Sequence, residues 1–126
     1  LKERVDSIRK GKSISLVAEH NKTVVGIASI NLERERQSHI GDFSISVRSG
    51  YRGIGLGTCL IKEILGLSKK NLKPKPKIIK LAVFANNAPA INLYKKIGFR
   101  QVAKIPDQLE FQKKLIDEII MLLYFQ

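Results

Sequence analysis

The chain has 126 residues, 44% of them hydrophobic and 27% charged, which is typical of one globular domain with a real core. No window reaches the roughly eighteen apolar residues of a membrane span, and the charged N-terminus shows no secretory signal. The formal net charge of +12 leaves a nucleic-acid or acidic-lipid partner open beside a plain lysine-rich background.

The first residues predict the end of a helix and then a β-hairpin. In residues 1–10 the apolar Val5 and Ile8 stand three apart among charged residues, which is the spacing of one helix face. Residues 14–18 and 24–32 are apolar and rich in β-branched side chains on either side of a short polar turn. They predict two antiparallel strands.

A third strand comes before the most unusual stretch of the chain. After a polar connection at residues 33–38, residues 39–47 alternate from Phe43 onward between apolar residues and serines. This alternation predicts a strand with one buried face. Gly41 breaks the rhythm and is a candidate bulge.

Residues 46–58 have the pattern of a strand end, a tight turn and a helix start. Gly53, Gly55 and Gly57 alternate, so several backbone N–H groups can turn toward one point. Acidic residues are absent from residues 43–62, and two arginines flank the turn. A helix start that lacks its own anion favours a bound anion, most often a phosphate. The alternative is an ordinary strand-to-helix turn.

The turn is followed by a helix, a linker and a strand. Apolar residues at three- and four-residue spacing predict a helix from residue 56 to residue 70 or 71. The lysine- and proline-rich run at residues 69–77 has no aromatic residue, so it favours a solvated loop over a nucleic-acid site. Residues 78–84 are largely apolar and predict a central strand.

The last part of the chain predicts one helix and two strands. Asn87 suits a helix cap, and Gly98 suits the end of the same helix. Residues 99–103 predict a strand, residues 105–114 an irregular loop and residues 115–125 a long final strand. Strand–helix–strand units flanked by antiparallel strands predict a mixed α/β sheet.

The single cysteine, Cys59, excludes an internal disulfide and favours a reducing compartment, so we expect a cytoplasmic protein. Its place one turn into the predicted helix suggests a small buried residue and not a nucleophile. With one Cys and two His (His20 and His39), soft ligands are too few for zinc, and we expect no metal.

Two familiar phosphate loops can be tested against the glycine-rich stretch. The dinucleotide pattern G-x-G-x-x-G fails from both possible starts. Begun at Gly53 it meets Thr58 where the third glycine is needed, and begun at Gly55 it meets Leu60. The nucleotide P-loop pattern G-x-x-x-x-G-K is matched by Gly50 and Gly55, but Leu56 occupies the position of its lysine. Neither NAD nor ATP is supported.

What fits is Arg52-x-x-Gly55-x-Gly57, which resembles the GNAT superfamily of acyl-CoA-dependent N-acetyltransferases. The run from Asn87 to Phe99 matches a second motif of that family, N-x-x-A-x-x-L-Y-x-x-x-G-F, at every specified position. Two motifs in the right order are far more specific than either alone.

The resemblance covers residues 14–124 and implies one N-acetyltransferase domain over residues 1–126. It implies a mixed, mainly antiparallel central sheet with helices on both faces. Family members begin with a strand and one or two helices. Here we expect that N-terminal strand and helix to be missing apart from a helix tail, and the absence of an initiator Met suggests a fragment or trimmed chain.

The resemblance implies acetyl-CoA as the donor substrate, with its pyrophosphate on the backbone N–H groups of the glycine-rich turn. The residues that it assigns to the cofactor are Val47, Arg52, Gly53, Ile54, Gly55, Leu56, Gly57, Thr58, Asn87 and Tyr94. For Asn87, the alternative is a helix cap alone.

The same resemblance assigns chemistry to three residues. Tyr94 would be the general acid that protonates the leaving thiolate, and its alternative is a core tyrosine. The backbone N–H of Val47 would stabilise the oxyanion. For the general base, Asp42 is the first choice, against a merely solvated carboxylate. Glu118 is a further candidate, His39 is the other titratable residue near Asp42, and Glu19 is expected to be exposed.

The leading hypothesis is an N-acetyltransferase in which an amine attacks acetyl-CoA directly through a tetrahedral intermediate. The amine would be a protein N-terminus, a lysine or a small amine, and the positive charge favours an acidic protein or peptide. A non-catalytic CoA-binding module and a basic nucleic-acid-binding domain are the alternatives, the second disfavoured. No membrane partner is expected, and a homodimer is left open.

Overall fold

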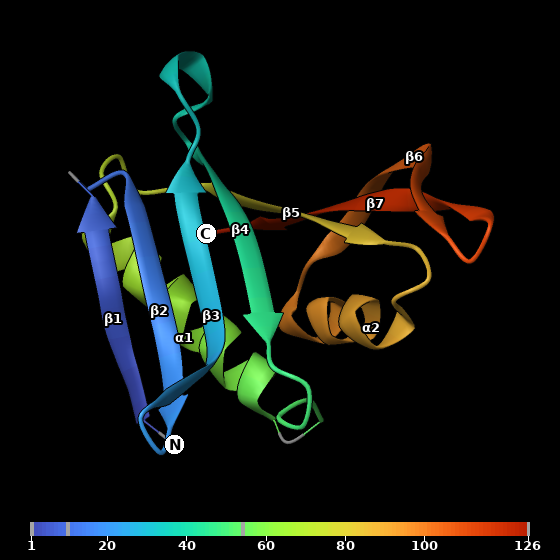
Figure 1. The fold of residues 1–126 in the computed structure, drawn as a ribbon. Coiled ribbons are helices and arrows are strands. Elements are labelled where there is room, and N and C mark those ends of the chain that lie inside the picture. The colour runs from blue at the N-terminus through green and yellow to red at the C-terminus, as the bar shows by residue number, and fades with distance from the viewer. Residues whose placement is uncertain (1, 10, 54, 126) are drawn as a thin grey trace. The chain divides into compact units, whose positions relative to one another are not determined.

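The computed structural model describes the backbone of residues 2–9 and the whole of residues 11–53 and 55–125. The chain divides into two compact units, Leu1–Lys77 and Ile78–Gln126. Both are seen in Figure 1, coloured from blue at the N-terminus to red at the C-terminus.

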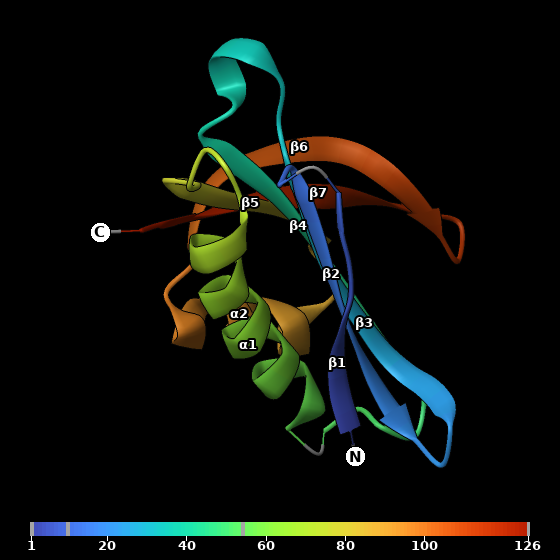
Figure 2. The ribbon, with the colours of Figure 1, turned by 90° about the vertical axis from the view of Figure 1, so that its left-hand side faces the viewer.

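The first unit is an antiparallel sheet covered by a helix. Its elements are β1 (Lys2–Arg9), β2 (Ser13–His20), β3 (Thr23–Leu32), the 3-10 turn η1 (Glu35–Gln37), β4 (Ile40–Val47) and α1 (Leu56–Asn71). Strand β1 pairs with β2, β2 with β3 and β3 with β4, all antiparallel. Figure 2 shows α1 against one face of this sheet, where it packs on β2, β3 and β4.

The helix tail expected at residues 1–10 is wrong, because residues 2–9 form strand β1. The register explains the misleading spacing. Val5 pairs with Leu16 and Ile8 with Ile14, with an irregularity between Val5 and Ser7. This bulge lets a three-residue spacing on β1 match a two-residue spacing on β2, which no pattern within residues 1–10 could indicate.

The predicted hairpin is confirmed as β2 and β3. Asn21 and Lys22 form its two-residue turn with φ of 51° and 64°, the left-handed pair that a tight hairpin turn requires.

The bulge expected at Gly41 is wrong, since β3 and β4 pair without a shift from Leu32–Gly41 to Gly26–Val47. The buried Gly41 keeps the regular alternation of β4.

The core of this unit lies between α1 and the sheet. The buried residues of α1 are Leu56, Leu60, Ile61, Ile64, Leu65 and Ser68. Cys59 is exposed, so its expected burial is wrong: at about 100° per residue it falls on the far side of the helix from that stripe.

Among the described residues, no helix is long and apolar enough to cross a membrane.

The second unit is a three-stranded sheet with one helix. Its elements are β5 (Ile78–Phe84), α2 (Ala88–Ile97), β6 (Arg100–Phe111) and β7 (Lys114–Tyr124). Strand β7 lies between β5 and β6 and pairs antiparallel with both. At the end of α2, a Cβ on Gly98 would lie 3.1 Å from Leu123 Cδ1, so the helix terminus closely approaches β7.

The irregular loop expected at residues 105–114 is wrong over most of its length. Strand β6 continues to Phe111 and returns through a two-residue turn at Gln112 and Lys113. Pairing is interrupted between Ile105 and Leu109, where three residues of β6 face one residue of β7. Pro106, which has no N–H for a ladder hydrogen bond, lies in this bulge.

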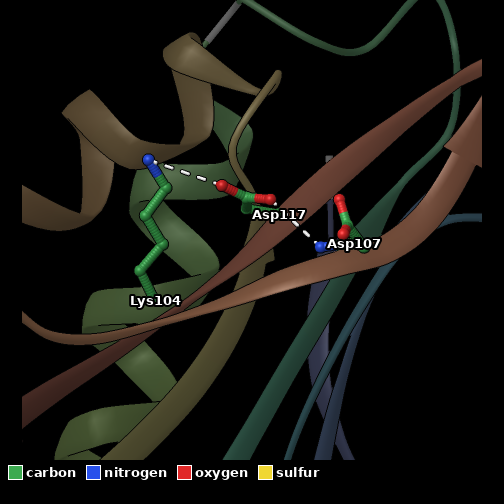
Figure 3. A network of polar contacts seen from close by, with 3 residues as sticks. All are labelled: Lys104, Asp107 and Asp117. Atoms are coloured by element: carbon green, nitrogen blue, oxygen red, sulfur yellow. Dashed lines mark hydrogen bonds and ion pairs between the residues drawn. The ribbon is translucent and has the colours of Figure 1, made fainter.

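Asp117 is the β7 residue opposite the bulge, and it holds the bulge in place (Figure 3). Its Oδ1 accepts from the backbone N–H of Asp107 at 3.1 Å, and its Oδ2 lies 3.5 Å from Lys104 Nζ. Its carbonyl accepts from the N–H of Ala85 at 2.8 Å, just beyond β5. One residue therefore joins all three strands of the second unit.

Candidate functional site

The end of β4 presents the backbone of Val47 away from β3. The N–H of Arg48 donates to Val25 O at 2.8 Å, so the facing residues Gly26 and Val47 form a non-hydrogen-bonded pair. The N–H and C=O of Val47 therefore point to the side of β4 opposite β3. That carbonyl accepts from Arg52 Nε at 3.1 Å.

Residues 48–55, called the glycine turn below, connect β4 to α1. Gly50, Gly53 and Gly55 have φ of 94°, 80° and 84°, and a Cβ on any of them would meet nothing within 4 Å. Glycine is needed there for backbone conformation, not for lack of space. Arg48 and Arg52 are exposed on the same turn, and Ile54 lies outside the described residues.

The start of α1 is open to an anion. Gly55 is the N-cap and has no side chain to cap the helix, and the first turn contains no acidic residue. The N–H of Cys59 donates to Gly55 O at 3.1 Å, so the N–H groups of Leu56, Gly57 and Thr58 precede this first intrahelical bond. These groups and the helix dipole favour a negative group at this end.

A pair of side chains that the sequence did not indicate attaches to this turn. His20, the last residue of β2, lies with Nδ1 2.7 Å from the Tyr51 hydroxyl oxygen. The two rings meet edge to face with centroids 5.6 Å apart. No local pattern could reveal this contact, because the partners are 31 residues apart.

In the second unit, Asn87 and Tyr94 lie on α2. Asn87 is the N-cap, and its Oδ1 accepts from the N–H of Ala90 at 3.3 Å. Tyr94 is 8% exposed and its ring meets that of Phe99 edge to face. Burial raises the pKa of the Tyr94 phenol above its ordinary value, so this hydroxyl stays protonated through neutral pH.

The candidate bases lie in different places. Asp42 is exposed on β4, five residues before Val47 and on the opposite strand face. Five residues of strand span about 17 Å, so a direct proton transfer at Val47 is beyond its reach. Glu118 is half-buried on β7, where it pairs with Phe84 and Ile105. Glu19, expected to be exposed, is half-buried.

The structure therefore groups the predicted site residues in two sets. Val47, Arg52 and the start of α1 belong to the first unit, and together they can bind an anion beside an outward-facing strand end. Asn87 and Tyr94 belong to the second unit, where one helix carries an amide and a protonated phenol. The first set presents backbone N–H groups and arginines, which suit an anion, and the second presents a protonated phenol, which can donate a proton.

Residues 2–99 match the model of the acetyltransferase (GNAT) family. The chain is 40% identical over 85 residues to the L-amino acid N-acetyltransferase AaaT of Escherichia coli, covering 67% of this chain and 51% of that protein. It is 30% identical over 109 residues to an N-alpha-acetyltransferase of Sulfurisphaera tokodaii, covering 78% and 63%. The chain thus spans less than two thirds of either relative.

The fold is shared with solved acetyltransferases. The structure of yncA from Salmonella typhimurium, determined with its cofactor acetyl-CoA, aligns with a TM-score of 0.80 at 23% identity, covering 90% of this chain and 65% of that one. This similarity confirms the predicted GNAT-like fold with its mixed, mainly antiparallel sheet. Together with the family match over residues 2–99, it shows that the chain belongs to the GNAT acetyltransferase family.

Proposed function

We propose that this chain is an N-acetyltransferase that moves the acetyl group of acetyl-CoA to an amine. The observation that carries this proposal is the glycine turn, with three left-handed glycines, two exposed arginines and a helix start without an acid. Such a turn suits the pyrophosphate of CoA. Family membership and the acetyl-CoA in the Salmonella relative support the same donor.

The cofactor would bind along Val47 and the glycine turn. The N–H of Val47 points to the side of β4 opposite β3, which is the direction that the acyl end of the cofactor requires. Gly53, Gly55, Leu56, Gly57 and Thr58 would hold the phosphates through backbone N–H groups, with Arg52 and Ile54 as flanking contacts. The Nδ2 group of Asn87 would donate to the pantetheine arm, since its Oδ1 already caps α2.

The proposed reaction is a direct transfer. The amine nitrogen attacks the thioester carbonyl carbon, and the Val47 N–H stabilises the resulting oxyanion. The C–S bond then breaks, and the Tyr94 hydroxyl gives its proton to the departing CoA sulfur. The amide product keeps the acetyl group, and the proton lost by the amine passes to a base. The raised pKa of Tyr94 supports its role, because the phenol stays protonated at neutral pH.

The base is assigned to Asp42 or Glu118, acting through water. Asp42 would need a chain of several waters, because it lies on the other face of β4 and about 17 Å along the strand from Val47. Glu118 is half-buried in the middle of a three-stranded sheet. Separate Asp42→Asn and Glu118→Gln variants distinguish them, since only the true base should shift the acid limb of the pH profile of kcat.

The acceptor we propose is an α-amino group, free or at a protein N-terminus. The two relatives support this class, since one is named for L-amino acids and the other for N-alpha acetylation. The net charge of +12 favours acceptors with acidic neighbours over polyamines. The lone cysteine favours a cytoplasmic location, which stays a prediction. A homodimer also stays a prediction.

The deciding experiment is an acceptor screen with acetyl-CoA and the complete natural protein, read as release of free CoA. The panel would contain L-amino acids, peptides with free N-termini, and the same peptides with a blocked N-terminus and a free lysine. Release only with free α-amino groups supports the proposal. Tight CoA binding without turnover on any amine would instead support a non-catalytic CoA-binding module.

A further inference from the structure

His20 and Tyr51 join the β2–β3 hairpin to the glycine turn. His20 ends β2, and Tyr51 lies in the turn between β4 and α1. Their 2.7 Å hydrogen bond and their edge-to-face ring contact, with planes at 71°, are two separate contacts between the same residues. The phenol of Tyr51 is therefore fixed to a sheet element outside the turn.

The turn needs such an attachment because its own packing is sparse. Gly50, Gly53 and Gly55 are left-handed, and a Cβ added to any of them would meet nothing within 4 Å. Glycine has the widest backbone freedom of any residue, so this segment loses much entropy when it is ordered around a ligand. A turn that is already ordered before binding avoids part of that cost.

Tyr51 is well placed to order the turn. Its N–H donates to Arg48 O at 3.0 Å, which closes the first part of the turn. The next residue, Arg52, donates from Nε to Val47 O at 3.1 Å. Fixing the Tyr51 ring therefore also fixes the peptide that leads into Arg52 and Gly53.

We infer that His20 is a positioning residue for the glycine turn. By holding Tyr51, it keeps this turn in the conformation that receives the pyrophosphate of CoA. The inference rests on the proposed function of that turn. Neither side chain has to touch the cofactor. The Tyr51 phenol can both donate and accept a hydrogen bond, so it can pair with either tautomer of His20.

The test is a double-mutant cycle on CoA affinity, measured by calorimetry on the complete protein. His20→Phe and Tyr51→Phe should each weaken CoA binding about three- to tenfold, the range expected for one net hydrogen bond. The double variant should bind no more weakly than either single variant, because both remove the same contact. His20→Asn, whose side-chain amide places a polar atom near the position of Nδ1, should restore much of the affinity.

Tyr124→Phe is the matched control, since it removes an exposed phenol from β7. Thermal melting of every variant separates a loss of stability from a loss of affinity. If His20→Phe does not fold, the CoA affinities of His20→Asn and Tyr51→Phe are compared instead. Equal CoA affinity in all variants, or additive losses in the double variant, would overturn this inference and leave the proposed function standing. Failure of the unaltered protein to bind CoA would overturn the proposed function itself.

Discussion

At the scale of the residue, Tyr94 is a buried side chain that carries a hydroxyl. Removing that hydroxyl in Tyr94→Phe keeps the ring that packs on Phe99, so the fold should persist. We expect kcat to fall about 100-fold, the low end for loss of a general acid, with CoA affinity nearly unchanged. The measurement is steady-state kinetics together with calorimetry on CoA.

The pH profile gives the same prediction a second readout. Burial raises the pKa of Tyr94, so the acid is fully protonated at neutral pH and is lost only in the alkaline range above its ordinary value. The unaltered enzyme should lose kcat there as pH rises, and Tyr94→Phe should lack that limb. Tyr124→Phe serves as control, and full activity of Tyr94→Phe would rule out the assigned role.

At the scale of the element, the placement of α1 depends on Gly26. A Cβ on Gly26 would lie 2.9 Å from Leu60 Cδ1 and 3.5 Å from Leu56 Cδ2. Leu60 is fully buried and cannot move aside freely. Gly26→Ala should therefore destabilise the protein by about 1–3 kcal/mol and weaken CoA binding by displacing the helix start.

The matched control for Gly26 is Gly66, which lies in α1 and is exposed, with nothing within 4 Å of an added Cβ. Gly66→Ala should stabilise the protein by about 0.5–1 kcal/mol, because alanine has the better helix propensity. Urea unfolding measures both changes. If Gly26→Ala matched the stability of the unaltered protein, the close approach of α1 would not be a constraint.

The β6 bulge is the other element whose form depends on one residue, Asp117. Asp117→Ala removes the acceptor of the Asp107 N–H and should cost about 1 kcal/mol. Asp117→Asn keeps an acceptor oxygen and loses only the exposed ion pair with Lys104, so it should cost less than about 0.5 kcal/mol. Denaturant unfolding tests the order, and Lys104→Ala should behave like Asp117→Asn.

At the scale of the whole molecule, the net charge of +12 should influence the choice of acceptor. Peptides with the same N-terminal residue but acidic or basic neighbours should differ in kcat/KM, with the acidic peptide preferred. Added salt should reduce this difference, because it screens surface charge. Measuring kcat/KM for both peptides at low and high ionic strength tests this, and a salt-independent preference would point to direct contacts in the pocket instead.

The sequence by itself predicted what local patterns determine. The alternation in β4 and the three- and four-residue spacing in α1 indicated their elements within a residue or two. The cap at Asn87 and the stop at Gly98 bounded α2. An anion site could be predicted at the glycine turn because its glycines, its arginines and its missing acids are neighbours in the chain.

The tertiary structure alone decided what depends on pairing between distant residues. Residues 2–9 are a strand because β2 lies beside them, and β6 extends to Phe111 because β7 supports it across a bulge. The outward direction of the Val47 N–H follows from the β3 register, and the contact of His20 with Tyr51 follows from the approach of the hairpin to the turn. Backbone hydrogen bonds and side-chain contacts between separate strands lower the free energy of these arrangements, and no short stretch of sequence contains both partners.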